Sequence, residues 1–172
     1  MKSTDLRPDE FHSYYGPYIE TLGDVELMVC LENGLHQISD FIGQIPDNRM
    51  DFLYAQGKWS IAEVLVHLMD AERVFQYRAL RFARNDRTEL MGFDQDFYVP
   101  ESFANDRTKG AIIEEFSALR KSTITFFKGL AEEQLMRSGK ANGAAMSVRA
   151  LGFVICGHQA HHFKILKERY LS

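Results

Sequence analysis

The sequence has few cysteines and no long apolar run. Its 172 residues include two cysteines, Cys30 and Cys156, without a CxxC pair. This argues against a disulfide-rich scaffold and against a zinc ribbon, and it fits the reducing environment of the cytoplasm. No apolar stretch approaches the roughly 20 residues that span a bilayer, and the polar N-terminus lacks the apolar core of a signal peptide. We therefore expect a cytoplasmic protein that does not enter a membrane.

A large excess of charge of one sign is also lacking. The formal net charge is -4, and 45% of the residues are hydrophobic, as in an ordinary globular domain. Because no strong positive field attracts phosphates, we expect neither a nucleic-acid partner nor binding to an anionic membrane. Five arginines follow one another closely, but they scatter around a helix among acidic neighbours, which favours a solvated face with ion pairs over a phosphate-binding track. They are Arg73, Arg78, Arg81, Arg84 and Arg87.

Prolines are scarce, which leaves long stretches free to form helices. The four prolines stand at positions 8, 17, 46 and 100. Apolar residues recur at helical spacing in four segments, and no strand-like alternation stands out. The segments are residues 24–45, 60–84, 111–130 and 147–170. At this length they predict a single all-α domain over residues 1–172, a four-helix bundle with residues 1–17 as an N-terminal extension.

Side chains that favour helix N-termini mark three of the expected helix starts. Asp24 and Ser147 are plausible N-caps, and Ser60 with Glu63 forms the capping-box pattern SIAE. The polar, glycine-containing stretch 85–109 is expected to be a long loop, and GKANGAAM a linker before the last helix.

Two of the expected helices place histidines where their patterns call for core residues. In the last helix, His158 and His162 lie about 40° apart on one face, because positions i and i+4 are separated by one turn. In the second helix, His67 interrupts an apolar stripe. The two stripes are Val148, Leu151, Ile155, His158, His162, Ile165 and Val64, His67, Ala71, Val74.

These histidines have two interpretations. A single histidine on an apolar face, such as His67, is usually a neutral core residue, and HxxxH on one face is a common metal-binding pair that also arises by chance. Three buried imidazoles are costly unless they are bonded, and one cation satisfies all three. Spacing does not choose among zinc, nickel, copper and ferrous iron. It also leaves His161, about 60° from His158, as an alternative ligand. Three protein ligands leave positions open, as in catalytic metal sites.

Other candidate residues carry weaker signals. Asp94 and Asp96 in FDQDF lack the glycine and distal glutamate of a calcium loop, so polar loop chemistry is the better interpretation unless the loop closes over the mouth of the bundle. Cys156 points about 200° away from His158 and is expected to serve packing.

Two acidic residues stand one helical turn on either side of His67. Glu63 and Asp70 are each placed to accept a hydrogen bond from an imidazole or to move a proton in catalysis. Ordinary helix-surface charge explains them equally well, and the sequence leaves both interpretations open.

Three runs of the sequence follow one another in this order: GKWSIAEVLVHLMDAERVFQYRALRFARND, GFDQDFYVP and SVRALGFVICGHQAHHFKILKERYL. Together they resemble the DinB family, in its YfiT-like branch of metalloenzymes, and the similarity extends from about Tyr18 to Leu171. The resemblance implies a four-helix bundle with a long crossover connection, often dimeric. It also implies a metal held by His67, His158 and His162, the same three that the stripes select, with His161 beside the site.

The resemblance further implies a metal-dependent enzyme. Relatives include transferases and isomerases that depend on low-molecular-weight thiols, and others described as hydrolases. We therefore expect a homodimer in which a divalent zinc, nickel or iron ion activates a thiol cofactor or water against a small electrophilic substrate. Two alternatives remain: a non-catalytic, metal-stapled module that binds a small molecule, and an interaction protein whose histidines are core residues.

Overall fold

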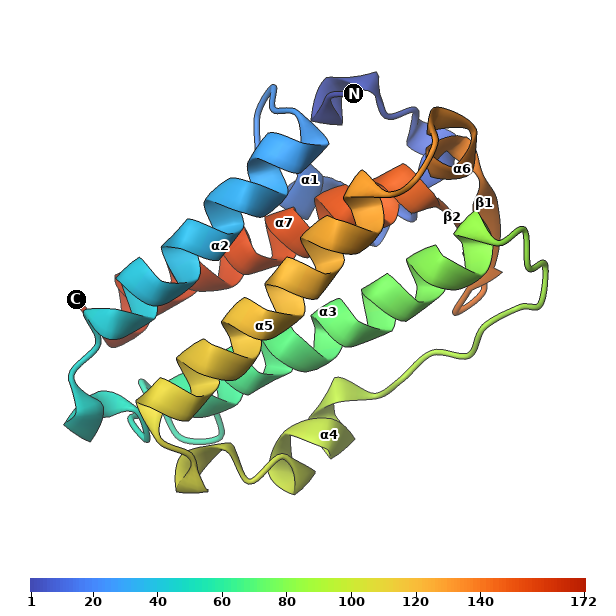
Figure 1. The fold of residues 1–172 in the computed structure, drawn as a ribbon. Coiled ribbons are helices and arrows are strands. Elements are labelled where there is room, and N and C mark those ends of the chain that lie inside the picture. The colour runs from blue at the N-terminus through green and yellow to red at the C-terminus, as the bar shows by residue number, and fades with distance from the viewer.

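Four long helices form the body of the molecule in a computed structural model that describes residues 1–172 (Figure 1). They are α2 (Leu27–Gly43), α3 (Ile61–Ala83), α5 (Lys109–Lys128) and α7 (Val148–Ile165). A π-helical turn, Leu166–Tyr170, continues α7. Helix α3 packs on α7 and α5, and α2 packs on the same two helices from the opposite corner. The predicted all-α four-helix bundle is confirmed.

A long connection links α3 to α5. These two helices run in the same direction, so residues 84–108 have to return along the length of the bundle (Figure 1). The connection was expected to be a loop, yet it contains the short helix α4 (Gln95–Glu101). Asp94 starts that helix, because its Oδ1 accepts a hydrogen bond of 2.9 Å from the Asp96 backbone N–H. Helix α4 lies against α3.

Two of the three expected N-caps are confirmed. Ser60 Oγ accepts from the Glu63 backbone N–H at 3.1 Å, and Ser147 Oγ accepts from the Ala150 backbone N–H at the same distance. The Glu63 carboxylate completes the capping box by accepting from the Ser60 backbone N–H at 2.7 Å.

The third expected cap, Asp24, was wrong. Helix α2 begins at Leu27, with Glu26 in the N-cap position and no side-chain cap. Asp24 instead binds Lys2 Nζ at 2.7 Å and Thr4 Oγ1 at 2.8 Å. The Asp24 carboxylate, which the helix pattern predicted as the cap, is therefore bound by residues near the N-terminus instead.

A short antiparallel hairpin replaces the expected linker before α7. Strands β1 (Ser138–Ala141) and β2 (Ala144–Ser147) follow the short helix α6 (Glu132–Met136). Asn142 and Gly143 form the turn with φ of 51° and 77°. Asn-Gly is the favoured pair for such a two-residue turn, but strands this short carry almost no alternation, so the sequence pattern did not reveal them.

The bundle core is divided into two apolar clusters by a polar layer. One cluster lies near the N-terminal segment and the other near the C-terminal end of α7. Between them, Glu72 of α3, Arg120 and Thr123 of α5, and His158 and Gln159 of α7 are all buried. Polar side chains therefore cross the middle of the bundle from helix to helix.

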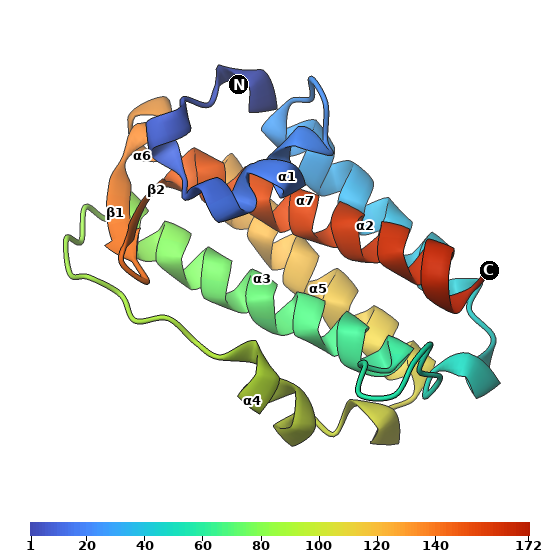
Figure 2. The same cartoon turned by 180° about the vertical axis from the view of Figure 1, so that it is seen from behind.

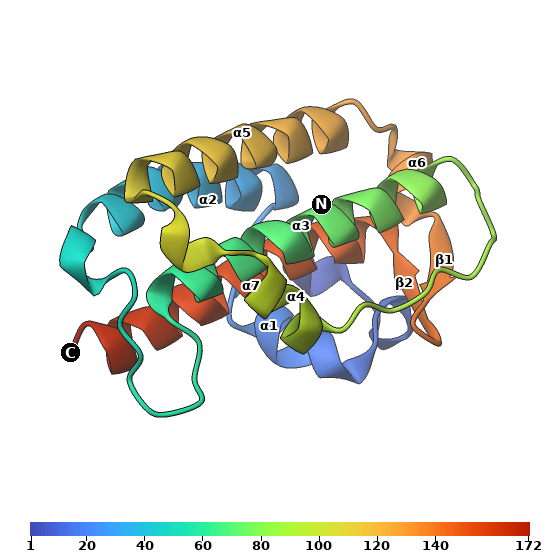
Figure 3. The same ribbon diagram turned by 90° about the horizontal axis from the view of Figure 1, so that it is seen from below.

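The N-terminal segment packs on the bundle rather than extending from it. Helix α1 (Gly16–Glu20) lies against α7, and Figures 2 and 3 show it on the same side of the α3–α7 pair as the connection that carries α4. Glu10 holds the segment by accepting from Ser147 Oγ at 2.8 Å and from Arg149 Nε at 2.7 Å. None of the helices is both long and apolar enough to span a bilayer.

Candidate metal centre and its cavity

Three histidine side chains converge where α3 packs on α7. His158 Nε2 lies 3.2 Å from His67 Nε2 and 3.1 Å from His162 Nε2. One nitrogen from each of the three rings lies within 4.8 Å of the other two. The structure thus brings together the residues that two separate stripes selected.

The neighbouring aromatic rings hold the histidines in a largely dry environment. The Trp59 ring packs 4.9 Å from that of His67, and the Tyr18 ring packs 5.5 Å from that of His158. His67 and His158 are buried, and His162 is half-buried. Residues from α1, α3 and α7 therefore enclose the group.

Burial keeps the three imidazoles neutral. It lowers the pKa of His67 to about 4 and that of His162 to about 3, with nearby imidazoles adding to the effect on His162. The pKa of His158 is held well below its usual value by burial and by the other histidines. A neutral imidazole offers a lone pair, which is the form that binds a metal.

Hydrogen bonding alone does not satisfy these nitrogens. A ring nitrogen either donates one proton or offers one lone pair, so His158 Nε2 cannot bond well to both neighbours at once. Two nitrogens on a tetrahedral ion, each about 2.0–2.1 Å from it, lie roughly 3.4 Å apart, close to the spacing seen here. The three histidines therefore fit a divalent cation better than they fit one another.

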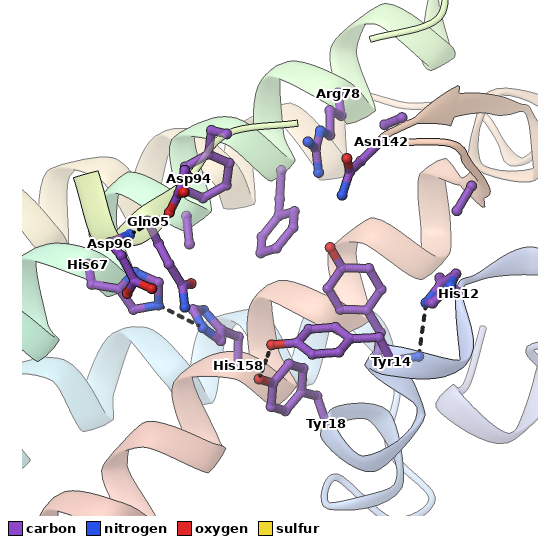
Figure 4. A pocket seen from close by; sticks show the side chains of 16 residues that line it. His12, Tyr14, Tyr18, His67, Arg78, Asp94, Gln95, Asp96, Asn142 and His158 are labelled. Carbon is purple, nitrogen blue, oxygen red and sulfur yellow. Dashed lines mark hydrogen bonds between the residues drawn. The ribbon is translucent and has the colours of Figure 1, made fainter. Parts of the chain in front are cut away.

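A cavity of about 540 Å³ opens beside the histidines. One face of α3 provides Ala71, Phe75 and Arg78, and the N-terminal segment provides several aromatic side chains. In Figure 4, His67 and His158 lie at one end of the cavity, while Arg78 and Asn142 lie at the other. The histidines thus border a space large enough for a small molecule.

The connection between α3 and α5 supplies acidic side chains to this cavity. The cavity is lined by Asp94, Gln95 and Asp96. The FDQDF segment therefore closes over the mouth of the bundle, the one arrangement in which its acidic residues were expected to matter. Asp96 also lines a smaller cavity that borders His162. Asp96 therefore lines both cavities that the histidines border, a position that its calcium-loop-like pattern did not predict.

The two acidic residues flanking His67 in sequence have other contacts. Glu63 is engaged in the capping box, and Asp70 lies 3.7 Å from Arg73 in a separate surface pocket. Burial raises the pKa of Asp70. Neither residue lines the cavity beside the histidines. Their suggested part in catalysis stays a prediction.

His161 lies beside the group rather than in it. Its ring packs 4.9 Å from that of Tyr18 and 5.2 Å from that of His162, and no nitrogen of His161 belongs to the convergent set.

Three tyrosines of the N-terminal segment line the cavity although no helix pattern pointed to them. They are Tyr14, Tyr15 and Tyr18, and the Tyr14 and Tyr18 hydroxyls lie 3.3 Å apart. Their clustering in SYYGPY was the available signal. Tyr14 and Tyr15 fall within residues 1–17, which were expected to be an extension, and Tyr18 lies just after it, outside all four expected helices.

One arginine of the 73–87 run departs from the expected solvated face. Arg73 and Arg81 form the expected ion pairs with the neighbouring Asp70 and Asp86, and Arg73 also pairs with Glu115 of α5. Arg78, however, is only 4% exposed and lines the cavity. The expectation was wrong there because Arg78 follows Ala71 and Phe75 on the face of α3 that the N-terminal segment covers.

The sequence and the fold were each compared with those of known proteins. A sequence model described as the DinB superfamily matches residues 30–166. No curated protein matches the sequence.

Two solved structures share the fold. YfiT from Bacillus subtilis, described as "a probable metal-dependent hydrolase with an unusual four-helix bundle topology", is 15% identical with a TM-score of 0.75, covering 95% of this chain and 90% of that one. A mycothiol-dependent maleylpyruvate isomerase is 9% identical with a TM-score of 0.68, covering 95% of this chain. This chain spans 62% of the isomerase, less than two thirds of its length.

Proposed function

Because this chain belongs to the DinB superfamily, we propose that it is a metal-dependent enzyme acting on a small molecule in the cavity beside its histidines. His67, His158 and His162 hold a divalent cation, with zinc, nickel or iron compatible with three imidazoles. The observation that carries the proposal is the convergence of three neutral imidazoles at the wall of a cavity of about 540 Å³. Three protein ligands leave room for a further ligand from the cavity.

When bound, such a cation lowers the pKa of a coordinating water or thiol. The chain's own residues provide the surroundings for that chemistry. Asp96, at the edge of both cavities that touch the histidines, is placed to accept a proton from a thiol or a water molecule. Burial raises the pKa of Tyr18, so its hydroxyl stays protonated and can donate to an oxygen of the substrate.

We propose that the nucleophile is a low-molecular-weight thiol or water, which makes the reaction a thiol transfer or a hydrolysis. One structural neighbour is named for its dependence on mycothiol and the other is described as a hydrolase, which supports both reactions as candidates. Phe75 and Tyr15 give the cavity an apolar wall that favours a small electrophile over bulk water.

Three further parts of the proposal concern setting and partners. We expect a homodimer in the cytoplasm, without nucleic acid. The two cysteines are unpaired, which fits a reducing compartment. Light scattering on the purified protein measures the dimer directly, and a mass of 19.8 kDa would contradict it.

Glu63→Gln and Asp70→Asn test the two acidic positions, since an activity loss with normal metal content would give them a catalytic part.

The central experiment determines the metal and what binds to it. Elemental analysis of protein purified without a histidine tag gives the metal content, and cobalt substitution provides a spectrum. Titration with several cellular thiols and with azide then distinguishes the reactions. A thiolate charge-transfer band with one thiol supports transfer, and an azide response without any thiol response supports hydrolysis.

One result of the same titration would contradict the proposal that the protein is an enzyme. A spectrum indifferent to every ligand, together with unfolding on chelation, leaves the non-catalytic, metal-stapled module. If His67, His158 and His162 bind no metal, the remaining interpretation is an interaction protein in which they are core residues.

A further inference from the structure

We propose that Arg78 binds a carboxylate at the end of the cavity remote from the histidines, so that the substrate or the thiol is an elongated molecule with a carboxylate at one end. The inference rests on the proposed function for the reacting end of the ligand. The anchoring end is carried by observations of its own, beginning with the surroundings of Arg78.

Three arginines are buried in this protein, and two of them have a glutamate partner. Arg120, 0% exposed, donates to Glu72 through Nε at 2.9 Å and Nη2 at 2.8 Å. Arg149, 6% exposed, forms the same two-pronged contact with Glu10. A buried guanidinium is costly without such a partner, and these two pairs follow the rule.

Arg78 is as deeply buried and has no such partner. It is 4% exposed, and no aspartate or glutamate of the chain forms an ion pair with it. Its one hydrogen bond to the backbone is from Nη2 to the Met91 carbonyl, at 3.2 Å. A positive charge buried without a counter-charge indicates that the counter-charge arrives with a ligand.

The remaining N–H groups of Arg78 border the cavity beside the Tyr15 hydroxyl, a neutral group whose pKa is raised by burial, an effect that the guanidinium partly offsets. The buried polar atoms that lack both a partner and access to solvent belong to Arg120 and Gln159, and none belongs to Arg78. Since Arg78 is itself buried and lines the cavity, its remaining N–H groups are reached through that space. They form the planar fork that binds the two oxygens of a carboxylate.

The position of Arg78 on α3 sets the shape of the ligand. His67, Ala71, Phe75 and Arg78 line the cavity along one face of this helix. Eleven residues separate the two ends, which corresponds to about 16 Å along the axis. The Arg78 side chain points back toward the helix N-terminus and covers part of that distance. A ligand that reaches both ends is therefore extended, and its middle lies over Phe75.

Charge is distributed unevenly along the cavity and favours one orientation. The acidic side chains Asp94 and Asp96 lie near the histidines, whereas Arg78 and Asn142 lie at the opposite end (Figure 4). The Asn142 backbone N–H donates to the Leu90 carbonyl at 2.9 Å, next to the Met91 carbonyl that Arg78 binds. An anionic end is thus attracted to Arg78, while Asp94 and Asp96 offset the positive charge of a cation on the histidines at the other end.

The anion is a carboxylate rather than a phosphate. Arg78 is the one arginine or lysine that lines the cavity, and His12, the further basic side chain there, uses Nδ1 to accept from the Tyr14 backbone N–H at 3.1 Å. A phosphate monoester carries up to two negative charges and calls for more than one cation, whereas one guanidinium matches one carboxylate.

The test uses probes with a thiol at one end and either a carboxylate or an amide at the other. Cobalt-loaded protein is titrated with ω-mercaptoalkanoates of increasing chain length and with the matching ω-mercaptoalkanamides, and the thiolate band reports binding at the histidines. We expect the best acid to bind about tenfold or more tightly than its amide, as for a charged hydrogen-bonded pair. In Arg78→Met this preference disappears while the band remains.

A second titration does not depend on the metal. Calorimetry with octanoate and octanamide, before and after treatment with a chelator, measures the anchor apart from any carboxylate that binds the metal. A preference for octanoate that Arg78→Met removes supports the anchor even if no thiolate band is ever seen, in which case only the proposed reaction fails. Equal binding of acid and amide by the wild type, or an acid preference that persists in Arg78→Met, overturns the inference.

Competition between ligands shows whether the thiol or the electrophilic substrate carries the carboxylate. If the thiol carries it, the mercaptoalkanoates show the Arg78-dependent preference and octanoate competes with them. If the electrophilic substrate carries it, octanoate binds together with a short neutral thiol such as mercaptoethanol.

Stability provides a check that Arg78→Met folds and that the charge is not structural. Removing an unpaired buried charge leaves the unfolding temperature unchanged or raises it. Arg120→Met is the matched control, and we expect it to lower the unfolding temperature because it strands Glu72 in the core. A comparable drop in Arg78→Met would mean that Arg78 stabilises the fold, and it would count against a ligand anchor.

Discussion

At the scale of single residues, direction on a helix distinguishes histidines that are adjacent in sequence. His158 and His162 point from α7 toward His67, whereas His161 packs on the ring of Tyr18. Adjacent positions on a helix are separated by about 100°, so His161 and His162 face different neighbours. The same residue type therefore serves two purposes within one turn.

We predict that His158→Ala and His162→Ala each abolish tight metal binding, while His161→Ala leaves one metal ion per chain. The reason is that only the first two contribute nitrogens to the convergent group. Elemental analysis after extensive dialysis measures the stoichiometry. Equal loss of metal from the His161 variant would instead require a site built from positions i and i+3.

At the scale of elements, the N-terminal segment is a wall of the cavity, and one buried acidic residue links it to the start of α7. Glu10 binds Ser147 and Arg149 at the start of α7, and the tyrosines that border the histidines follow it. Burial alone would raise the pKa of Glu10, but the hydrogen bonds from Arg149 and Ser147 outweigh it and lower the pKa to about 2.

We predict that Glu10→Gln lowers the free energy of unfolding by about 3 kcal/mol at neutral pH. A carboxylate with a lowered folded pKa stabilises the protein above its unfolded pKa of 4.5, and this contribution is lost as the pH falls toward 2. The difference between wild type and variant should therefore narrow in that range, as measured by urea unfolding. Asp9→Asn, whose carboxylate is exposed, is the control and should change stability by less than about 1 kcal/mol.

The contact between α1 and α7 depends on a glycine. A Cβ at position 157 would lie 2.3 Å from the Tyr18 carbonyl oxygen, which is backbone and cannot move without shifting α1. We predict that Gly157→Ala destabilises the protein by about 1–3 kcal/mol, although alanine is the better helix former. It should also weaken ligand binding in the cavity by displacing Tyr18.

Gly110→Ala is the matched control for this change, because nothing lies within 4 Å of a Cβ there. It should leave stability unchanged or raise it by up to about 1 kcal/mol. Thermal unfolding of both variants, with ligand titration of each, measures the effect. If Gly157→Ala behaved like Gly110→Ala, α1 would not be packed on α7 as described.

At the scale of the whole molecule, the bundle contains enough apolar core to fold around an empty metal site. Two clusters, each of 18 buried apolar residues, lie on either side of the polar layer that contains His158. The apolar clusters, and not a bound metal, are therefore expected to be the main source of the stability of the fold.

We predict that chelation leaves the helical content unchanged and lowers the unfolding temperature only modestly, while binding of thiols and azide at the histidines is lost. Circular dichroism and thermal unfolding before and after treatment with a chelator provide the measurement. Loss of helical signal on chelation would show that the metal is structural. Recovery of thiol or azide binding on adding zinc, nickel or cobalt would show which ions the site accepts.

Local patterns in the sequence were enough to predict much of the fold. The helical recurrence of apolar residues predicted all four long helices, and the side chains of Ser60 and Ser147 marked two of their starts. The same recurrence identified His67, His158 and His162 as residues standing in core positions. These features depend on neighbours within one or two turns, which is why sequence alone determined them.

The cavity, by contrast, was decided by tertiary structure. Its walls come from the N-terminal tyrosines, the 93–96 segment and the Asn142 turn, which are far apart in the sequence and carry no common period. Arg78 illustrates the difference most clearly. It shares a face of α3 with Ala71 and Phe75, and it is buried because a segment about 60 residues earlier in the sequence folds over that face. Which charges lose their water depends on how distant segments pack, and no local pattern contains that information.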